Sequence, residues 1–509
     1  MSARSLSLPV GVRALLATSR ELLGENEGYL VGGTVRDALL GRPLADLDLA
    51  VGGDAPAFAR ALADHLGGHY VLLDAERGTA RVALDEGPVR VIDVAHLRGD
   101  IANDLSLRDF TIDAIATRID APDVLCDPCG GARDLAQRTV RLVSEQALID
   151  DPLRLLRAVR LAVQLDFTIA PDTANALRRH ASEIDRAAAE RQRDELSRCF
   201  ATPRAAQALR LLDGVGLLDR LLPEVTAGRG VEQPKEHHWD VFDHAIETVA
   251  ALDWMLADGP PQAGREAAMW RALWDGLAVE PGLRDHLAGE TVEGRTHAAL
   301  LKTAGLLHDV AKPETRAPDE TGRIRFFGHA ERGAETARRV LARLRFGRRE
   351  VDLVATMVEE HLRPTQLGAT DSEPPTRRAL FRFFRDTGEA AEGVLLLSLA
   401  DALAARGPDM PIERWRGHVT YVAHVLARRR EDETIARPER LLTGEDVMAA
   451  LEISPGPEIG RLLAALEEAH ASGEVVTRED ALAFVQHLHE ETNDAPRELR
   501  VPAGAGGLR

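Results

Sequence analysis

The sequence has 509 residues, of which 45% are hydrophobic and 28% charged, with a formal net charge of −19. A chain of this length is expected to form two to four domains. It contains no apolar run of about 18 residues and no early secretion signal, so we expect a cytoplasmic protein without contact to a membrane. The excess of acidic side chains, 82 against 63 basic ones, excludes non-specific nucleic-acid binding over the whole surface but allows a local basic path. Three cysteines predict neither a disulfide framework nor a zinc site.

The first 140 residues contain the strand signals. Short β-rich runs, separated by Gly, Asp and Pro, lie at 29–33, 46–51, 69–74, 80–84 and 89–95. Between the second and third runs, the apolar residues recur at helical spacing and predict a helix over 55–66. After residue 140 the strand pattern stops and helical periodicity continues. We therefore predict an α+β protein, in which a small mixed α/β domain with a short β-sheet precedes mostly helical domains.

Interruptions rich in Gly and Pro divide the chain into predicted parts. The predicted parts are an α/β head over 1–140, a helical neck over 141–230, a histidine-containing helical domain over 231–420, a helical tail over 421–490 and a disordered segment over 491–509. The last part is rich in glycine and has no periodicity.

Two aspartates interrupt the apolar run DLDLAV. Side chains alternate between the faces of a strand, so Asp46 and Asp48 project to one face while Leu47 and Leu49 project to the other. Two carboxylates about 7 Å apart repel each other unless a cation lies between them. Mg²⁺ suits this position because it prefers carboxylate and phosphate oxygens. Asp93, in a neighbouring predicted strand, is expected to complete the metal cage, and we predict that all three aspartates are catalytic.

A glycine pair lies just before this run. Gly32 and Gly33 end a strand and lead into a predicted helix, where backbone N–H groups can approach a phosphate closely. Arg36 is expected to reach the same anion. A glycine pair or a D-x-D pair alone is common in turns. The order strand, Gly-Gly, helix and D-x-D strand is much more specific and predicts a phosphate cradle facing a metal site.

This stretch closely resembles the head of the class II tRNA nucleotidyltransferase and bacterial poly(A) polymerase superfamily. The segment NDLSLRDFTIDAIA, 103–116, is similar to the family's R-R-D-F-T-x-N-A segment, whose arginine and aspartate contact the incoming nucleotide. The resemblance implies this role for Arg108 and Asp109. Leu107 replaces the first arginine and Asp113 replaces the usual asparagine, so the roles of these two positions stay open.

Arginines recur every three residues at positions 154, 157 and 160, which places them along one slowly drifting helix face. From the residues alone, a solvated basic face is the alternative. The family's E-D-x-x-R segment presents its aspartate and arginine to the incoming base, which implies this role for Asp151 and Arg154. A carboxylate accepts from the exocyclic amine that C and A share, and a guanidinium donates to a ring nitrogen or carbonyl. Arg157 and Arg160 are expected to belong to the same nucleotide site.

Histidines and aspartates recur in the order H…HD…H…H…D between residues 244 and 401. An adjacent His-Asp pair in an apolar helix is costly to bury without a partner, and a metal ion supplies one. The order resembles the HD phosphohydrolase superfamily, in the form fused to some bacterial tRNA nucleotidyltransferases, and implies divalent transition metals of unknown identity. The expected ligands are His244, His308, Asp309 and Asp401 for a first ion, and His329 and His361 for a second.

The resemblance implies template-independent addition of CMP and AMP to tRNA 3′ ends, from CTP and ATP, by two-metal chemistry with Mg²⁺. A segment over 441–484 resembles the C-terminal part of CCA-adding relatives and favours tRNA as the substrate. Poly(A) polymerase activity, and a split activity that adds only CC or only A, stay open as alternatives. A further alternative is an HD phosphohydrolase whose head only binds RNA. The oligomeric state is not predicted.

Overall fold

The computed structural model describes residues 6, 8–234, 237–292, 294–367, 374–431 and 440–494. The chain divides into two compact units, Met1–Thr226 with Val340–Phe346, and Ala227–Arg339 with Gly347–Arg509. This division lies close to the predicted boundary at 230, and the finer predicted boundaries stay predictions. The predicted disordered segment begins at 491, but the last helix runs to Asp494, and residues 495–509 lie outside the described part.

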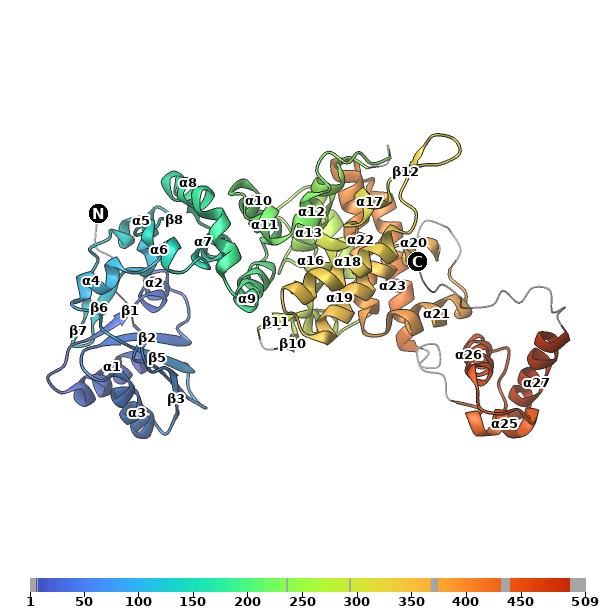
Figure 1. Ribbon diagram of the computed structural model, residues 1–509, viewed down its shortest axis with the longest axis horizontal. Helices are drawn as coiled ribbons and strands as arrows, with labels where there is room; N and C mark the ends of the chain where they lie inside the picture. Colours follow the sequence, from blue (N-terminus) through green and yellow to red (C-terminus); the bar gives the residue numbers. More distant parts are fainter. Residues whose placement is uncertain are drawn as a thin grey trace, which may run out of the picture. The chain divides into compact units, whose positions relative to one another are not determined.

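The first unit contains a seven-stranded mixed sheet, coloured blue to cyan in Figure 1. Its strands are β1 Gly28–Val31, β2 Asp46–Val51, β3 His69–Asp74, β4 Thr79–Ala83, β5 Val91–His96, β6 Ala116–Arg118 and β7 Ala121–Cys126, in the spatial order β3-β4-β5-β2-β1-β6-β7. β2 and β5 pair in parallel, with Asp48 opposite Asp93. β1 pairs with β2 antiparallel, with Leu30 opposite Leu49. These pairings place the predicted carboxylates on neighbouring strands at the centre of the sheet.

The remaining elements of this unit are short strands and helices. They are α1 Val10–Leu23, α2 Gly33–Leu39, α3 Ala55–Leu66, α4 Ile101–Ser106, the 3₁₀ helix η1 Thr111–Asp113, α5 Gly131–Ala136, β8 Thr139–Val140, α6 Gln146–Asp150, α7 Arg154–Leu165, β9 Thr168–Ile169, α8 Pro171–His180, the 3₁₀ helix η2 Ala181–Arg186, α9 Ala189–Phe200, α10 Ala205–Gly214, α11 Leu218–Leu221 and α12 Pro223–Thr226. α3 packs on β3, β4 and β5, while α2 contacts β1 and β2. Asp54 caps α3 by accepting from the N–H of Ala57, and Gly67 ends it in the left-handed conformation.

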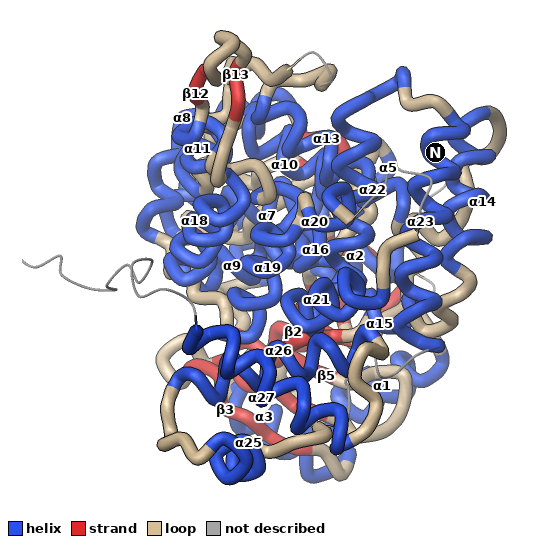
Figure 2. The backbone as a smooth tube through the Cα atoms, turned by 90° about the vertical axis from the view of Figure 1, so that its right-hand side faces the viewer, coloured by secondary structure: helices blue, strands red, loops and turns tan. Residues whose placement is uncertain are grey.

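The second unit is almost entirely helical, as the blue tube of Figure 2 shows. Its elements are α13 Val241–Met255, α14 Arg265–Leu277, α15 Leu283–Ala288, β10 Glu290–Val292, β11 Arg295–Thr296, α16 His297–Leu307, α17 Lys312–Thr315, β12 Ala317–Pro318, β13 Ile324–Arg325, α18 His329–Arg343, α19 Arg348–Glu360, α20 Arg363–Gln366, α21 Arg377–Thr387, the 3₁₀ helix η3 Gly388–Ala390, α22 Ala391–Arg406, the 3₁₀ helix η4 Gly407–Asp409, α23 Ile412–Glu431, α25 Gly444–Leu451, α26 Pro457–Ser472 and α27 Arg478–Asp494. α13, α16, α19 and α22 pack against one another and form the centre of the unit. α25, α26 and α27 form a small bundle with its own apolar core around Val447, Leu466 and Val485.

The predicted α+β fold is confirmed, with one correction. Short strands occur after residue 140, namely β9 to β13, although we predicted that strands stop there. These strands span two or three residues each, which is too short to produce an alternating apolar pattern. No helix in the described part of the chain combines the length and apolar character that crossing a membrane requires.

Candidate active sites

The three predicted carboxylates of the head lie on adjacent strands. Leu47 and Leu49 are buried on one face of β2, whereas Asp46 is exposed and Asp48 is half-buried, so the predicted alternation is confirmed. Burial raises the pKa of Asp48 to about 6, with Arg108 opposing the shift and the neighbouring carboxylate of Asp93 adding to it. This cluster of negative charge in a partly desolvated place fits a hard divalent cation such as Mg²⁺.

Asp93 has a protein partner that the sequence did not reveal. Arg81 on β4 binds it through two bonds, from Nε to Oδ1 at 2.7 Å and from Nη2 to Oδ2 at 2.9 Å. Arg81 lies directly opposite Asp93 in the antiparallel β4–β5 pairing, so strand register creates this contact. A charged pair at cross-strand positions is the only sequence signal for it.

The glycine turn brings backbone close to the carboxylates. Gly32 has φ +70°, and a Cβ there would lie 2.6 Å from Nη1 of Arg108 and 3.5 Å from Oδ2 of Asp48. The N–H of Gly32 donates to the carbonyl of Ile115 at 3.1 Å, so this group is already bonded within the fold. Thr34 fixes β2 against α2, because its Oγ1 accepts from the N–H of Asp48 at 2.8 Å.

Arg36 lies in a buried ion-pair network behind this turn. Its Nη1 donates to Oδ1 of Asp113 at 2.6 Å, and its Nε and Nη2 bind Asp37. Arg157 on α7 lies 3.0 Å from Asp109 and 4.0 Å from Asp113. Burial raises the pKa of Asp113, against the opposing effect of Arg36. These ion pairs give Asp113 a structural role, while the predicted contacts of Arg36, Asp109 and Arg157 with a nucleotide stay predictions.

The predicted base-reading residues lie at the start of α7. Asp151 accepts two bonds from Arg191 on α9, at 3.1 and 2.8 Å. Burial acts to raise the pKa of Asp151, but Arg191 outweighs this effect and lowers the pKa. Arg154 donates to the carbonyl of Ala147 at 3.2 Å. Sequence analysis did not place Arg191 beside this carboxylate, because the two residues are 40 positions apart.

The three arginines of α7 do not form one solvated face. Arg160 is buried and pairs with Glu195 on α9 at 2.6 Å and with Gln164 at 2.7 Å. Arg157 reaches Asp109 instead. α7 therefore uses its arginines to join the head to α9, and a contact of Arg160 with a nucleotide stays a prediction.

In the second unit, the six predicted metal ligands come together from five helices or their ends. They are His244 on α13, His308 and Asp309 just after α16, His329 on α18, His361 just after α19 and Asp401 on α22. Oδ2 of Asp309 lies 3.4 and 3.1 Å from Nε2 of His244 and His308, and Oδ1 lies 3.3 and 3.7 Å from Nε2 of His329 and His361. Oδ1 of Asp401 lies 3.0 Å from Nε2 of His244. Sequence analysis gave Asp309 to the first ion alone, whereas the structure places it between two possible metal groups.

Backbone carbonyls orient three of the imidazoles. Nδ1 of His308 bonds the carbonyl of Gly305 at 2.8 Å, Nδ1 of His329 that of Phe326 at 2.6 Å, and Nδ1 of His361 that of Val358 at 2.6 Å. Each bond spans three residues and turns Nε2 toward Asp309. This is the arrangement by which a second partner fixes the tautomer of a metal-binding histidine.

The donor set fits two divalent transition metals. Asp309 is 2% exposed, and among the described residues neither of its oxygens has a hydrogen-bond donor in good geometry. Burial opposes ionisation of Asp309, but His308 and Lys312 outweigh it and hold the pKa well below its usual range. Burial lowers the pKa of His361 to about 3, so this imidazole is neutral and able to bind metal. Imidazole and carboxylate together suit ions such as Mn²⁺, Fe²⁺ and Zn²⁺.

A cavity of about 1150 Å³ is lined by four of the predicted ligands, Asp309, His329, His361 and Asp401. Lys312, which sequence analysis missed, lies 2.6 Å from Oδ2 of Asp309 and donates to Oε1 of Gln233 at 2.7 Å. Its position three residues after Asp309 was the available signal. His237, which sequence analysis left unassigned, also lines the cavity.

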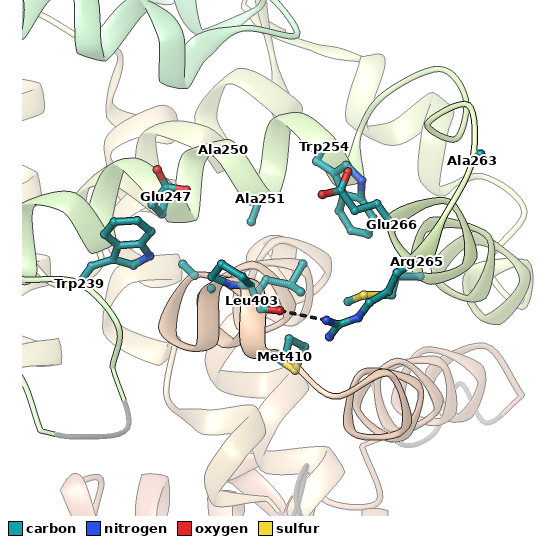
Figure 3. A pocket seen from close by; sticks show the side chains of 14 residues that line it. Trp239, Glu247, Ala250, Ala251, Trp254, Ala263, Arg265, Glu266, Leu403 and Met410 are labelled. Carbon is teal, nitrogen blue, oxygen red and sulfur yellow. Dashed lines mark hydrogen bonds between the residues drawn. The ribbon is translucent and has the colours of Figure 1, made fainter.

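A second cavity of about 590 Å³ lies among α13, α14 and α22 of the same unit (Figure 3). Apolar side chains line most of it, including Trp239, Trp254 and Met269. Its lining includes the cation Arg265, which donates to the carbonyl of Pro408 at 2.9 Å. Two glutamates also line it, so this cavity does not suit a phosphate.

Four protein-family models match successive parts of the chain. The poly(A) polymerase head domain matches residues 28–141, and a probable RNA- and SrmB-binding site of polymerase A matches 166–228. An HD domain matches 276–406, and a putative tRNA nucleotidyltransferase domain 2 matches 413–485.

Similar proteins match along nearly the whole chain. An A-adding tRNA nucleotidyltransferase of Deinococcus radiodurans is 39% identical over 469 residues, which cover 91% of this chain and 96% of the relative. A CC-adding tRNA nucleotidyltransferase of Thermus thermophilus is 37% identical over 466 residues, covering 90% and 93%. The structure of a Bacillus stearothermophilus CCA-adding enzyme with CTP aligns with a TM-score of 0.62 at 22% identity, covering 96% of this chain and 99% of that one.

Proposed function

The chain belongs to the tRNA nucleotidyltransferase family, and from this premise we propose that it adds CMP and AMP to the 3′ end of tRNA, using CTP and ATP. The observation that carries the proposal is the carboxylate cluster of Asp46, Asp48 and Asp93 beside the Gly32 turn and Arg108. These groups suit a nucleoside triphosphate with Mg²⁺.

The carboxylates Asp46 and Asp48 would hold Mg²⁺, which lowers the pKa of the primer 3′-hydroxyl and stabilises the leaving pyrophosphate. Asp93, held in place by Arg81, would complete the metal cage as its third carboxylate. The Gly32–Gly33 backbone leaves space for the triphosphate, and Arg108 lies beside this space to offset phosphate charge. Asp109, braced by Arg157, would act on the sugar side, as the family resemblance implies.

Asp151 and Arg154 would select the base. The Asp151 carboxylate accepts from an exocyclic amine, which cytosine and adenine share and uracil lacks. Arg191 orients this carboxylate by two bonds. A mismatched base would leave buried donors or acceptors unpaired, which is the usual origin of strong discrimination.

The test is nucleotide incorporation into defined tRNA transcripts. Transcripts that end before CCA, after one C, or after CC are incubated with CTP, ATP or both, and the 3′ ends are sequenced. We expect complete CCA from the first transcript and A from the last. Long tails of A without C would instead establish a poly(A) polymerase and overturn the proposal.

The names of the full-length relatives favour a second candidate. One is A-adding and the other CC-adding, so a chain of this type can carry only part of the reaction. The same assay separates the two candidates. A split enzyme would extend only the transcript that ends in CC, or would stop after adding CC.

For the second unit we propose metal-dependent phosphoester hydrolysis at the HD site. Water would supply oxygen to phosphorus and a proton to the leaving alkoxide as the P–O ester bond breaks. The shared carboxylate Asp309 and the adjacent Lys312 support this proposal, because two residue groups that could hold metal share Asp309 and a cation lies beside it. The Asp309→Ala variant should lose Mn²⁺-dependent phosphate release and keep nucleotide incorporation. If the wild-type protein incorporated no nucleotide, the head would instead be an RNA-binding module. Incorporation that survives Asp48→Ala would show that Asp48 does not hold the catalytic metal.

A further inference from the structure

Phe327 is an exposed aromatic side chain at the edge of the HD cavity. It is 77% exposed, which is the highest fraction among the exposed aromatic residues of the described part. It lines the cavity that contains Asp309 and Asp401. An apolar ring of this size in water carries an energetic cost, which binding of a planar apolar ligand would remove.

The fold holds Phe327 in a fixed relation to the metal ligands. The β12–β13 hairpin, which projects from the helices in Figure 2, precedes it and is braced by Asp319, which accepts from Thr321 and Arg325. After it come Gly328, with φ +74°, and His329. The carbonyl of Phe326 bonds Nδ1 of His329 at 2.6 Å. The peptide that carries Phe327 is thus bonded to a predicted metal ligand.

The rest of the cavity suits an anion larger than phosphate. Arg406 and Arg414 line it, and neither has an ion-pair partner among the described residues. Tyr421 is 9% exposed, lines the same cavity, and its hydroxyl is buried without a hydrogen-bond partner in the described part. Glu331, Glu359 and Glu360 add acidic groups at the rim, so the free cations are confined to part of the lining.

We infer that Phe327 is a stacking platform for a nucleobase, and that this contact makes the HD site prefer phosphoesters of nucleosides over base-free phosphoesters. The phosphate lies at the Asp309 end, where Lys312 supplies a cation, and the base stacks on the Phe327 ring at the rim. Arg406, Arg414 and Tyr421 are positioned to bind a further phosphate or sugar oxygen. A free nucleotide and the terminal nucleotide of an RNA share this chemistry. The inference rests on the proposed hydrolysis at this site.

The experiment compares substrates with and without a base. Phosphate release by the Mn²⁺-loaded full-length protein is measured with AMP, with an RNA that ends in a 3′-phosphate, and with ribose 5-phosphate. Stacking on an aromatic ring contributes about 1–3 kcal/mol per base, so Phe327→Ala should lower kcat/KM for at least one of the two nucleotide substrates by about fivefold or more. Ribose 5-phosphate should be unaffected, and Phe327→Trp should restore the nucleotide activity. Val476→Ala, at another exposed apolar residue of the same unit (64% exposed), is the matched control.

The two nucleotide substrates show whether the base belongs to a free nucleotide or to the end of an RNA. The substrate whose kcat/KM falls more in Phe327→Ala is the substrate whose base stacks on this ring. Equal losses on ribose 5-phosphate would show a structural role and overturn the inference, as would unchanged activity on both nucleotides. If the wild-type protein released no phosphate, the proposed hydrolysis would fail separately. In that case, calorimetric titration of the Mn²⁺-loaded protein with AMP still tests the stacking. AMP that binds at the head contributes equally in the wild type and in Phe327→Ala, so a difference between the two proteins reports binding at the HD site. Unweakened AMP binding in the variant would overturn the inference.

Discussion

The two proposed metal sites of this protein differ in how much of the coordination the chain would supply. In the head, Asp46 is exposed and Asp48 half-buried on one strand, with Asp93 tied to Arg81. In the HD site, His244, His308 and Asp309 are almost completely buried, and four imidazoles surround one carboxylate. The head site is therefore incomplete without its substrate, whose phosphates must supply ligands. The HD site is nearly complete by itself.

The two sites also differ in how far neighbouring cations compensate the buried carboxylate. Burial raises the pKa of Asp48 to about 6 because Arg108 compensates only partly. At Asp309 burial is outweighed by imidazoles and Lys312, and the pKa falls well below its usual range. A weakly compensated carboxylate suits a metal that arrives with each nucleotide, whereas a fully compensated one suits a resident metal. The following variants test this contrast.

The largest effect is expected from Asp48→Asn. The variant should lose nucleotide incorporation by about a thousandfold or more, because removing a metal ligand forfeits several kcal/mol of transition-state stabilisation. Primer extension measures it, and phosphate release at the HD site should be unchanged. Asp64→Asn, at an exposed position on α3, is the matched control. Retention of full incorporation would remove Asp48 from the metal site.

Metal removal should separate the two units by stability. A bound ion whose free concentration is 100 times its Kd stabilises the fold by about 3 kcal/mol. EDTA should therefore lower the unfolding temperature of the helical unit and leave that of the head unchanged. Differential scanning calorimetry with and without added Mn²⁺ measures this. Metal analysis by mass spectrometry should find two ions in the wild-type protein and one in His361→Ala. It should find none in Asp309→Ala, because both groups share this carboxylate. An equal response of both units to EDTA would contradict the contrast.

A smaller effect is expected at the base site. Arg191→Ala removes both bonds to Asp151, and we expect about a tenfold loss of kcat/KM for CTP and ATP. Because Arg191 is partly exposed, solvent limits the loss. Misincorporation of UMP and GMP should rise in the same assay. Arg186→Ala, at another exposed arginine of this unit, should change neither quantity. A uniform loss without misincorporation would show that Asp151 does not read the base.

The strands and the candidate metal ligands could be named from the sequence because each has a local signal. The alternation in DLDLAV predicted β2 and the exposure of Asp46. The helical spacing of apolar residues predicted α3 with the bounds that the structure shows. The HD ligands followed from residue type and order, since few other functions place His and Asp side by side in apolar helices. β6 and β7 were missed because their residues, such as those around Asp123, show little apolar alternation.

Contacts between distant elements could not be predicted in this way. Arg81 meets Asp93 through strand register, and Arg191 meets Asp151 through the packing of α7 on α9. Arg36 was predicted to face a phosphate, yet it pairs with Asp113, at the position where the family usually has asparagine. A sequence shows where an arginine lies in the chain, but which carboxylate the arginine neutralises depends on three-dimensional packing.

The smallest effect concerns the stability of the metal-free head. Folding raises the pKa of Asp48 from 3.8 to about 6, so the protonated form is favoured in the folded state. The benefit of protonation is fully present below pH 3.8 and is lost as the pH rises through 6. In EDTA, Asp48→Asn should therefore raise the free energy of unfolding of the head by about 1–3 kcal/mol at pH 8. The gain should shrink below pH 6 and vanish near pH 4, as urea titrations at each pH can measure. A gain independent of pH would show that packing, and not the buried charge, sets the cost of this carboxylate.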